Sequence, residues 1–363
     1  MATVSLLAVA SYFCTMHHHE IFMQRCLQLA TLGQQWVAPN PMVGALVVNN
    51  GIVIGEGYHQ QFGGPHAEVN AVNAVIDKTL LKGATIYVSL EPCSHFGKTP
   101  PCANLIIEHK IAKVVIACLD PNPLVAGKGI ALLQEAGIEV ITGVLEKEAI
   151  ALNKIFIHFH TQKKPFVVLK WAQTADAFCG RYPNSSLSNK ITNWYADVLV
   201  HQLRSTVTAI LVGYKTALLD NPTLTNRKWF GKSPLRIIID LENKLPQHLN
   251  VFKDGLSTLV FTLYPMQDTH SVSYLKLKNR ERFIDEILET LYQKNIQSVL
   301  IEGGPKTLQL FINNNAWNEA HIFTSDIIWQ EGVHAPILIK SKEVTSTLLL
   351  NNAYKIFKPE ISL

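Results

Sequence analysis

The chain has 363 residues, of which 48% are hydrophobic and 17% are charged, and its formal net charge is +4. A single hydrophobic core stops growing at roughly 250–300 residues, so this length predicts two globular domains. The small basic excess, 32 basic against 28 acidic residues, argues against a nucleic-acid partner, and the lack of a run of about 18 apolar residues argues against a membrane span.

The N-terminal segment, residues 1–15, is predicted to be an extension without structure. Its apolar stretch lacks the basic residues that open a secretory signal, and it is too short to span a bilayer. A second methionine, Met16, begins the sequence MHHHEIFMQRCLQLA, which has a helical pattern. The first domain is therefore predicted to cover residues 16–148.

Strands and helices alternate along this first domain. A hairpin is expected from strands 43–48 and 52–57, because Asn50-Gly51 is the preferred residue pair of a type I′ turn. The elements that follow are a helix at 66–76, a strand at 84–90, a helix at 103–109, a strand at 113–117, a helix at 130–136 and a strand at 139–142. This order predicts a layered α/β domain with a largely parallel sheet.

The segment 146–164 is helical and then polar, and it ends at Lys163-Lys164-Pro165. A domain boundary is placed there, so the second domain covers residues 165–363. It again has an α/β pattern. Its expected strands are at 166–170, 209–212, 236–240, 258–262, 298–301 and 321–324, and its expected helices are at 194–204, 282–294 and 307–313.

A metal site is predicted in the first domain. His66, Cys93 and Cys102 are the ligand types of a catalytic zinc site, which uses three protein ligands and leaves a fourth position for water. Glu68 stands two residues after His66, at the start of the same helix, and can serve this water as general acid and base. The other cysteines, Cys14, Cys26, Cys118 and Cys179, are interpreted as reduced, buried side chains.

These residues resemble the zinc deaminase signature, a His-x-Glu followed by Pro-Cys and a second Cys. The His-Ala-Glu opens a helix and the Pro-Cys ends a strand, as the signature requires. The second cysteine comes nine residues after the first, whereas nucleic-acid deaminases have two residues between their cysteines.

The longer loop resembles one particular family. The runs PNPMVG at 39–44, GGPHAE at 63–68 and EPCSHFGKTPPC at 91–102 are similar to the deaminase half of the bifunctional riboflavin-biosynthesis deaminase–reductases. In the second domain, LKWAQTAD at 169–176 and the run from Val212 to Arg227 are similar to the reductase half. The resemblance covers about residues 17–363.

The resemblance implies both fold and activity. The expected architecture is a cytidine-deaminase-like three-layer α/β/α domain followed by a dihydrofolate-reductase-like α/β domain. The first would deaminate 2,5-diamino-6-(5-phosphoribosylamino)pyrimidin-4-one, and the second would reduce the ribosyl C1′ to give 5-amino-6-(5-phosphoribitylamino)uracil. The implied cofactors are one Zn²⁺ per chain and NADPH, and the enzyme is expected to be a cytoplasmic homo-oligomer.

The family register also implies the reductase site residues. Positions that contact the nucleotide are Ala172, Lys190, Thr216, Asp220, Leu241, Gly304, Pro305, Lys306, Thr307, Leu308, Gln309 and Leu310. Positions that contact the substrate are Ser188, Arg204, Leu224, Arg227 and Glu302. Arg204 and Arg227 suit a bidentate phosphate clamp. In the deaminase half, Asn40 would face the ring and Lys98 the phosphate.

Two other readings remain open on the residues alone. A nucleic-acid editing deaminase would show a basic surface and a short Cys-x-x-Cys, and neither is present. In the other alternative, the second domain only assembles the oligomer or binds a ligand without turnover, which an NADPH oxidation assay would distinguish.

Overall fold

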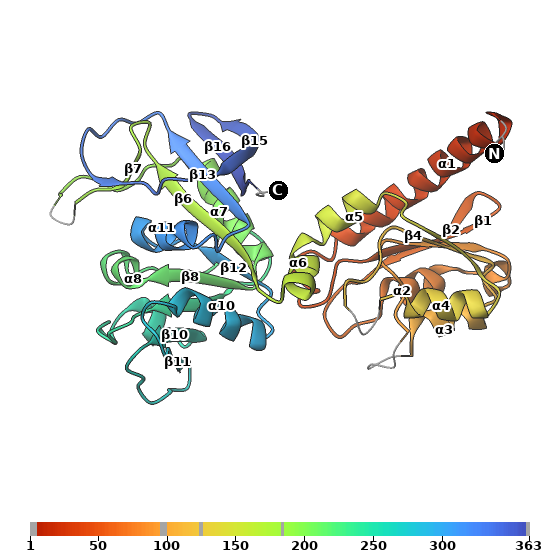
Figure 1. Cartoon of the computed structure of the whole chain (residues 1–363), viewed down its shortest axis with the longest axis horizontal. Coiled ribbons are helices and arrows are strands. Elements are labelled where there is room, and N and C mark those ends of the chain that lie inside the picture. The colour runs from red at the N-terminus through yellow and green to blue at the C-terminus, as the bar shows by residue number, and fades with distance from the viewer. Residues whose placement is uncertain (1–5, 95–99, 123–125, 183–184, 361–363) are drawn as a thin grey trace. The chain divides into compact units, whose positions relative to one another are not determined.

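A computed structural model describes residues 6–94, 100–122, 126–182 and 185–360, with the backbone alone given for residues 6–17 (Figure 1). The chain divides into two units, Met1–Gln162 and Lys163–Leu363, and each has its own sheet and core. Among the described residues, no helix combines the length and apolarity that crossing a bilayer requires.

The first unit is built on a five-stranded sheet in the order β2-β1-β3-β4-β5. Its strands are β1 Gly44–Asn49, β2 Ile52–Tyr58, β3 Thr85–Val88, β4 Lys113–Ile116 and β5 Glu139–Thr142. Strands β3, β4 and β5 are parallel, but β1 is antiparallel to both β2 and β3. Four of the five strands thus run in the same direction, as expected for a largely parallel sheet, and the hairpin strand β1 alone runs against them between β2 and β3.

Helices cover both faces of this sheet. On one face, α2 Ala67–Ala74, α3 Cys102–Glu108 and α4 Lys128–Glu135 contribute Ala71, Ile106 and Leu133 to a core with alternate strand residues such as Val114 and Ile116. On the other face, α1 Leu6–Thr31, α5 Glu146–Leu152 and α6 Lys154–Gln162 pack against the intervening residues, among them Leu46 and Val115. The 3₁₀ turn Lys78–Leu81 joins α2 to β3. This is the predicted three-layer α/β/α architecture.

Two features of the hairpin formed by β1 and β2 depend on glycine. Asn50 and Gly51 both have positive φ, 50° and 76°, as the predicted type I′ hairpin turn requires. A Cβ on Gly57 would lie only 2.4 Å from the Ala71 amide nitrogen. The absence of a side chain at Gly57 therefore lets α2 lie directly on β2.

The N-terminal helix is longer than the sequence predicted. Residues 1–15 were expected to be without structure, whereas α1 begins at Leu6. The run LLAVASYF lacks proline and glycine, so nothing in it interrupts the helix that continues from Met16.

The second unit has a nine-stranded sheet in the order β11-β10-β9-β8-β12-β6-β13-β16-β15. In this order, every neighbouring pair of strands between β11 and β13 is parallel. The last two pairs, β13-β16 and β16-β15, are antiparallel. The strands are β6 Phe166–Gln173, β8 Ala209–Gly213, β9 Leu235–Ile239, β10 Thr258–Thr262, β11 Val272–Lys276, β12 Ser298–Ile301, β13 Glu319–Ser325, β15 Ser341–Leu349 and β16 Asn352–Pro359, with a separate pair β7 Phe178–Gly180 and β14 Val333–His334.

Within the described residues of this unit, the helices are α7 Trp194–Thr206, α8 Tyr214–Asp220, α9 Asn250–Lys253, α10 Phe283–Gln293 and α11 Pro305–Asn313. Helices α10 and α11 bury Ile287, Leu291 and Phe311 against Leu169 and Leu211 of the central strands. The α/β class predicted for this half is thus confirmed, with an antiparallel edge that the sequence had not revealed.

Candidate active sites

The three predicted metal ligands meet beyond the carboxyl end of β3. His66 is the residue that caps the N-terminus of α2, and Cys102 is the first residue of α3. Cys93 lies on the segment that leaves β3, and the Cys102 amide donates a hydrogen bond to its sulfur at 3.3 Å. Two helix N-termini and one strand end therefore supply the three side chains.

The spacing of these ligand atoms fits zinc. His66 Nδ1 lies 3.3 Å from Cys102 Sγ and 3.5 Å from Cys93 Sγ, and the three ligand atoms all lie within 4.8 Å of one another. Tetrahedral Zn–N and Zn–S bonds of about 2.1 and 2.3 Å place ligand atoms roughly 3.5–3.8 Å apart. Over the described part of the chain, no other group of three histidine, cysteine or acidic side chains meets this criterion.

Glu68 lies beside this cluster without belonging to it. Its side chain is buried, and its carboxyl group interacts with the Cys102 thiol. Burial, with a smaller contribution from the charge of Cys93, raises the pKa of Glu68 to about 7. A carboxyl group in this setting can both accept and release a proton near neutral pH.

A buried histidine that sequence reasoning missed connects the zinc ligands to Asn40. His59 Nδ1 lies 2.9 Å from the Pro65 carbonyl, and its Nε2 lies 3.0 Å from Asn40 Nδ2. A carbonyl only accepts, so Nδ1 carries the proton and Nε2 accepts from the Asn40 amide. The amide oxygen of Asn40 is thereby left to face another donor. The same histidine ring lies edge-on to His66, with centroids 5.7 Å apart.

Glu91 is a second residue that sequence reasoning missed, although it precedes Pro92-Cys93. Its buried carboxylate accepts hydrogen bonds from the amides of Asp120, Gly127 and Gly129, at 3.0 to 3.3 Å. These bonds attach the start of α4 and the segment before it to the strand end that carries Cys93. Lys98, which was expected to meet the substrate phosphate, lies outside the described residues.

In the second unit, the predicted nucleotide contacts gather at the carboxyl edge of the parallel strands. These residues belong to four neighbouring strands of the sheet. Ala172 lies near the end of β6, and the others follow β9, β8 and β12. Ligands of open α/β sheets bind at this edge. The residues concerned, from β9 to β6, are Leu241, Thr216, Gly304 with the first residues of α11 up to Leu310, and Ala172. The segment from Gly304 to Leu310 is thus a helix N-terminus and not a loop.

Close backbone approaches bring two of these loops together. A Cβ on Gly213 would lie 2.3 Å from Thr307 Oγ1, and a Cβ on Gly303 would lie 2.5 Å from Val212 Cα. Thr216 Oγ1 would lie 3.0 Å from a Cβ on Gly304. The N-termini of α8 and α11 therefore lie side by side, where backbone amides can meet a phosphate.

The predicted substrate contacts include a buried ion pair. Arg204 donates from Nε and Nη2 to the two carboxylate oxygens of Glu302, at 2.7 and 2.8 Å, and Lys170 Nζ lies 4.0 Å from the same carboxylate. Burial opposes ionisation of Glu302, but Arg204 and Lys170 outweigh it and lower its pKa to about 2. Lys170, which sequence reasoning did not assign, thus completes a cluster of three charged groups.

This pairing corrects the expected phosphate clamp. The edge of the Arg204 guanidinium that carries Nε and Nη2 faces Glu302, and Nη1 donates to the Thr225 carbonyl at 3.0 Å. Sequence patterns do not reveal this pairing, because Glu302 lies 98 residues away from Arg204. Arg204 is therefore not arranged for bidentate phosphate binding.

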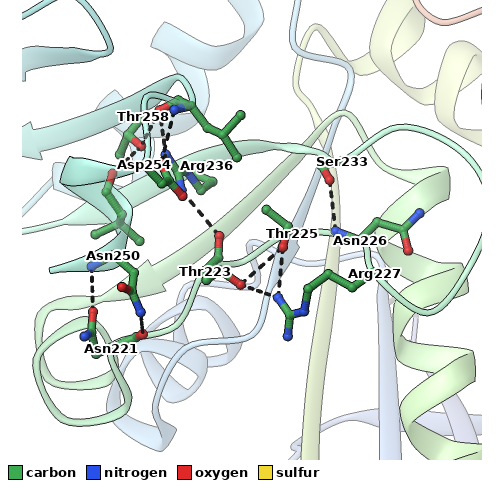
Figure 2. Close-up of polar contacts among 12 residues, drawn as sticks. Asn221, Thr223, Thr225, Asn226, Arg227, Ser233, Arg236, Asn250, Asp254 and Thr258 are labelled. Carbon is green, nitrogen blue, oxygen red and sulfur yellow. Dashed lines mark hydrogen bonds and ion pairs between the residues drawn. The ribbon is translucent and has the colours of Figure 1, made fainter.

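Arg227 is differently placed. Its side chain is exposed, and Nη1 donates to the hydroxyl groups of Thr223 and Thr225 (Figure 2). Its amide donates at 2.9 Å to Nδ1 of His201, whose pKa burial and the neighbouring arginines lower to about 4. The neutral imidazole can accept this bond, which fixes the backbone of Arg227.

The structure places Leu224 and Ser188, the two remaining substrate candidates, and the nucleotide candidate Lys190 in different surroundings. Leu224 is buried in the loop before Arg227. Ser188 and Lys190 have local contacts, such as the bond from the Lys190 amide to Ser188 Oγ at 3.1 Å, and both are exposed.

Both units match known families. Residues 16–118 match the cytidine and deoxycytidylate deaminase zinc-binding region, and residues 165–356 match the RibD C-terminal domain. The riboflavin biosynthesis protein RibD of Aquifex aeolicus is 41% identical over 86% of this chain and 88% of its own length. The protein of the same name from Bacillus amyloliquefaciens is 40% identical over 89% of this chain and 88% of its own length.

Solved structures agree over nearly the whole chain. A Thermotoga maritima protein described as a diaminohydroxyphosphoribosylaminopyrimidine deaminase/5-amino-6-(5-phosphoribosylamino)uracil reductase is 37% identical, with a TM-score of 0.86 over 95% of this chain and 99% of that one. Acinetobacter baumannii RibD is 30% identical, with a TM-score of 0.87 over the same shares.

Proposed function

Because the chain belongs to the RibD family of bifunctional riboflavin-biosynthesis enzymes, we propose that its two sites act in sequence on one phosphorylated pyrimidine. The chain is a deaminase and a reductase, with Zn²⁺ and NADPH as cofactors. The first unit would deaminate the diaminopyrimidinone that carries a phosphoribosylamino group, and the second would reduce C1′ of the ribosyl group. The cluster of His66, Cys93 and Cys102 beside the buried Glu68 carries this proposal.

In the deaminase site, we assign proton transfer to Glu68. When bound, zinc lowers the pKa of a coordinated water to about 7 and so supplies the attacking oxygen. Glu68 would take the proton of this water and pass it to the departing amino group. The Asn40 amide oxygen, oriented by His59, would accept a hydrogen bond from the ring. The reaction balances when both protons of the water are transferred, one to the ring nitrogen and one to the amino group, which leaves as ammonia.

In the reductase site, we assign the nucleotide to the carboxyl edge of strands β9, β8, β12 and β6. NADPH supplies a hydride when it is bound there. Its contacts would be the positions predicted from the family register: Ala172, Lys190, Thr216, Asp220, Leu241, Gly304, Pro305, Lys306, Thr307, Leu308, Gln309 and Leu310.

The substrate of this second reaction would bind against the loop 221–227 and the charged cluster around Glu302. We assign substrate contacts to Ser188, Leu224, Arg227 and Glu302, with Arg204 acting by holding Glu302 and Thr225. Arg227 is the exposed cation of this group, so we assign the substrate phosphate to it.

Replacing Arg227 by alanine is expected to weaken use of the deaminated substrate by about 10- to 150-fold. A hydrogen bond to a charged group contributes roughly 1.5–3 kcal/mol, and 1.4 kcal/mol is a factor of ten. The loss should fall on KM, because a phosphate remote from C1′ is bound equally before and during hydride transfer. Steady-state kinetics at saturating NADPH measure it.

Lys228→Ala is the matched control, since it removes the adjacent cation, which pairs with Asp197. It should leave KM unchanged. Wild-type kinetics in Arg227→Ala, or a loss confined to nucleotide binding, would show that the substrate lies on another side of this unit.

We propose that the chain forms a homo-oligomer through the second unit. Trp194 and Tyr195 begin α7, and Leu348 and Leu350 lie at the turn between β15 and β16; all four are at least half exposed. Asn193 joins the two places by donating to the Leu349 carbonyl at 2.7 Å. Exposed apolar patches of this kind are typical of protein–protein contacts. Sedimentation of the full chain as a monomer at micromolar concentration would refute this.

We also propose a cytoplasmic location. The described cysteines, Cys26, Cys93, Cys102, Cys118 and Cys179, are free thiols, and thiolate ligands persist in a reducing compartment. Cell fractionation should recover both activities with cytosolic markers, and recovery with membranes would contradict this location.

A further inference from the structure

The loop 221–227 is held by side chains that lie outside it. Three alternate carbonyl groups of this loop each accept a hydrogen bond. Asn250 Nδ2 donates to the Asn221 carbonyl at 2.8 Å, and Arg236 Nη1 donates to the Thr223 carbonyl at 3.4 Å (Figure 2). The third, Thr225, accepts from Arg204 as described above. Every second peptide of the loop is therefore fixed from outside.

The loop needs such external bonds. Asn221 and Leu224 have positive φ angles of 39° and 56°, a backbone region that disfavours a leucine. Leu224 nevertheless keeps its side chain buried. An unfavourable local conformation persists only when surrounding contacts determine it.

Arg236 is suited to impose this conformation. It lies on β9 with only 2% of its side chain exposed, and it pairs with Asp254 at 2.5 and 2.8 Å. Its Nη2 also donates to the Leu256 carbonyl at 2.5 Å. A guanidinium fixed by a carboxylate and a carbonyl cannot follow the loop, so the loop must conform to it.

Asn250, the first residue of α9, holds the beginning of the loop. Its own amide donates to Asn221 Oδ1 at 2.7 Å while its side chain donates to the Asn221 carbonyl. Thr258 Oγ1 donates to the Val251 carbonyl at 2.9 Å and so attaches α9 to β10. The two bonds between Asn250 and Asn221 thus connect the loop to the sheet.

We propose that Asn250 and the Arg236–Asp254 pair are positioning residues of the reductase, which set the loop so that Leu224 and Arg227 meet the phosphorylated substrate. This inference rests on the proposed substrate contacts of Leu224 and Arg227. Neither Asn250 nor Arg236 touches the substrate in this account; both act through the backbone of the loop.

Asn250→Asp tests this without removing the side chain. An aspartate at the first position of α9 suits the helix N-terminus, but it cannot donate to the Asn221 carbonyl. We expect KM for the deaminated substrate, at saturating NADPH, to rise about 2- to 12-fold, the factor that one net hydrogen bond represents. The kcat of reduction, the deaminase activity and the unfolding midpoint should stay at their wild-type values.

Asn49→Asp is the matched control, because Asn49 Nδ2 likewise donates to a carbonyl, that of Leu80 in the first unit, at 2.7 Å. Arg236→Lys is a second variant that keeps the charge opposite Asp254 but loses the fork, and it should also raise KM.

The outcomes separate this inference from the proposed function. Unchanged KM in both folded variants, while Arg227→Ala raises KM, would overturn the positioning role alone. Unchanged KM in Arg227→Ala as well would overturn the proposed substrate contacts. A fall in kcat together with the unfolding midpoint would show that Asn250 and Arg236 serve the fold rather than the loop.

Discussion

Glu68→Gln is expected to lower the rate of deamination by about 10²- to 10⁴-fold, the usual contribution of general acid–base catalysis. The glutamine amide keeps the size of the side chain but cannot accept and return a proton. His66, Cys93 and Cys102 are untouched, so the variant should still bind one zinc per chain. Ammonia release and metal analysis by mass spectrometry measure the two effects.

Glu56→Gln is the matched control in the same unit. Glu56 is exposed and paired with Arg25 on the surface, so its loss should leave deamination unchanged. Deamination by Glu68→Gln at the wild-type rate would refute the assignment of Glu68 as general acid and base. Loss of zinc from this variant would instead place Glu68 among the ligands.

Cys93→Ala is expected to abolish deamination while reduction of supplied deaminated substrate stays within a few fold of wild type. Two remaining protein ligands do not make the three-ligand site that catalytic zinc requires. The two units have separate sheets and cores, so damage to one site need not reach the other. Zinc content, ammonia release and NADPH oxidation should be measured on the same preparation.

Cys118→Ala provides the comparison, because Cys118 is also a free thiol and is buried outside the cluster, with its sulfur donating to the Ser89 carbonyl. It should keep both activities and its zinc. If both activities vanish in a folded Cys93→Ala protein, the division of labour between the units is wrong.

The deaminase site could be predicted from sequence because its functional residues lie close together along the chain. His66 and Glu68 are two residues apart and Cys93 and Cys102 nine apart, so each half of the site lies on one short segment. The structure adds the residues that hold these segments, His59 and Glu91. Their partners, Asn40 and the amides near Gly127, are distant in sequence, and periodicity does not report such contacts.

The reductase site was harder to predict from sequence, because its residues pair with partners that are distant in the chain. The pairing of Arg204 with Glu302 joins α7 to the end of β12, and nothing within helical spacing of Arg204 reveals it. The antiparallel strands β15 and β16 were also missed. Strand β15 is exposed along most of its length, so it lacks the alternation of apolar and polar residues that identifies a half-buried strand.

For helix α1, the sequence contained the relevant local signal, but the prediction did not use it. The apolar N-terminal run was interpreted as an extension because it resembled neither a secretory signal nor a membrane span and was followed by a second methionine, Met16. The continuity of helix-forming residues from Leu6 to Thr31 outweighed this argument. The composition of the segment excluded a secretory signal and a membrane span, whereas its helix propensity accounts for the helix that it forms.

We propose that one chain carries out two consecutive reactions on one substrate. The most direct test incubates the full wild-type chain with the diaminopyrimidinone phosphate substrate and NADPH, and follows ammonia and NADPH together. We predict that ammonia appears first and that NADPH is then consumed in an equal amount. Glu68→Gln should suppress both, and adding deaminated substrate should restore NADPH consumption but not ammonia release. NADPH consumption without ammonia release, or ammonia release without any NADPH consumption, would contradict it.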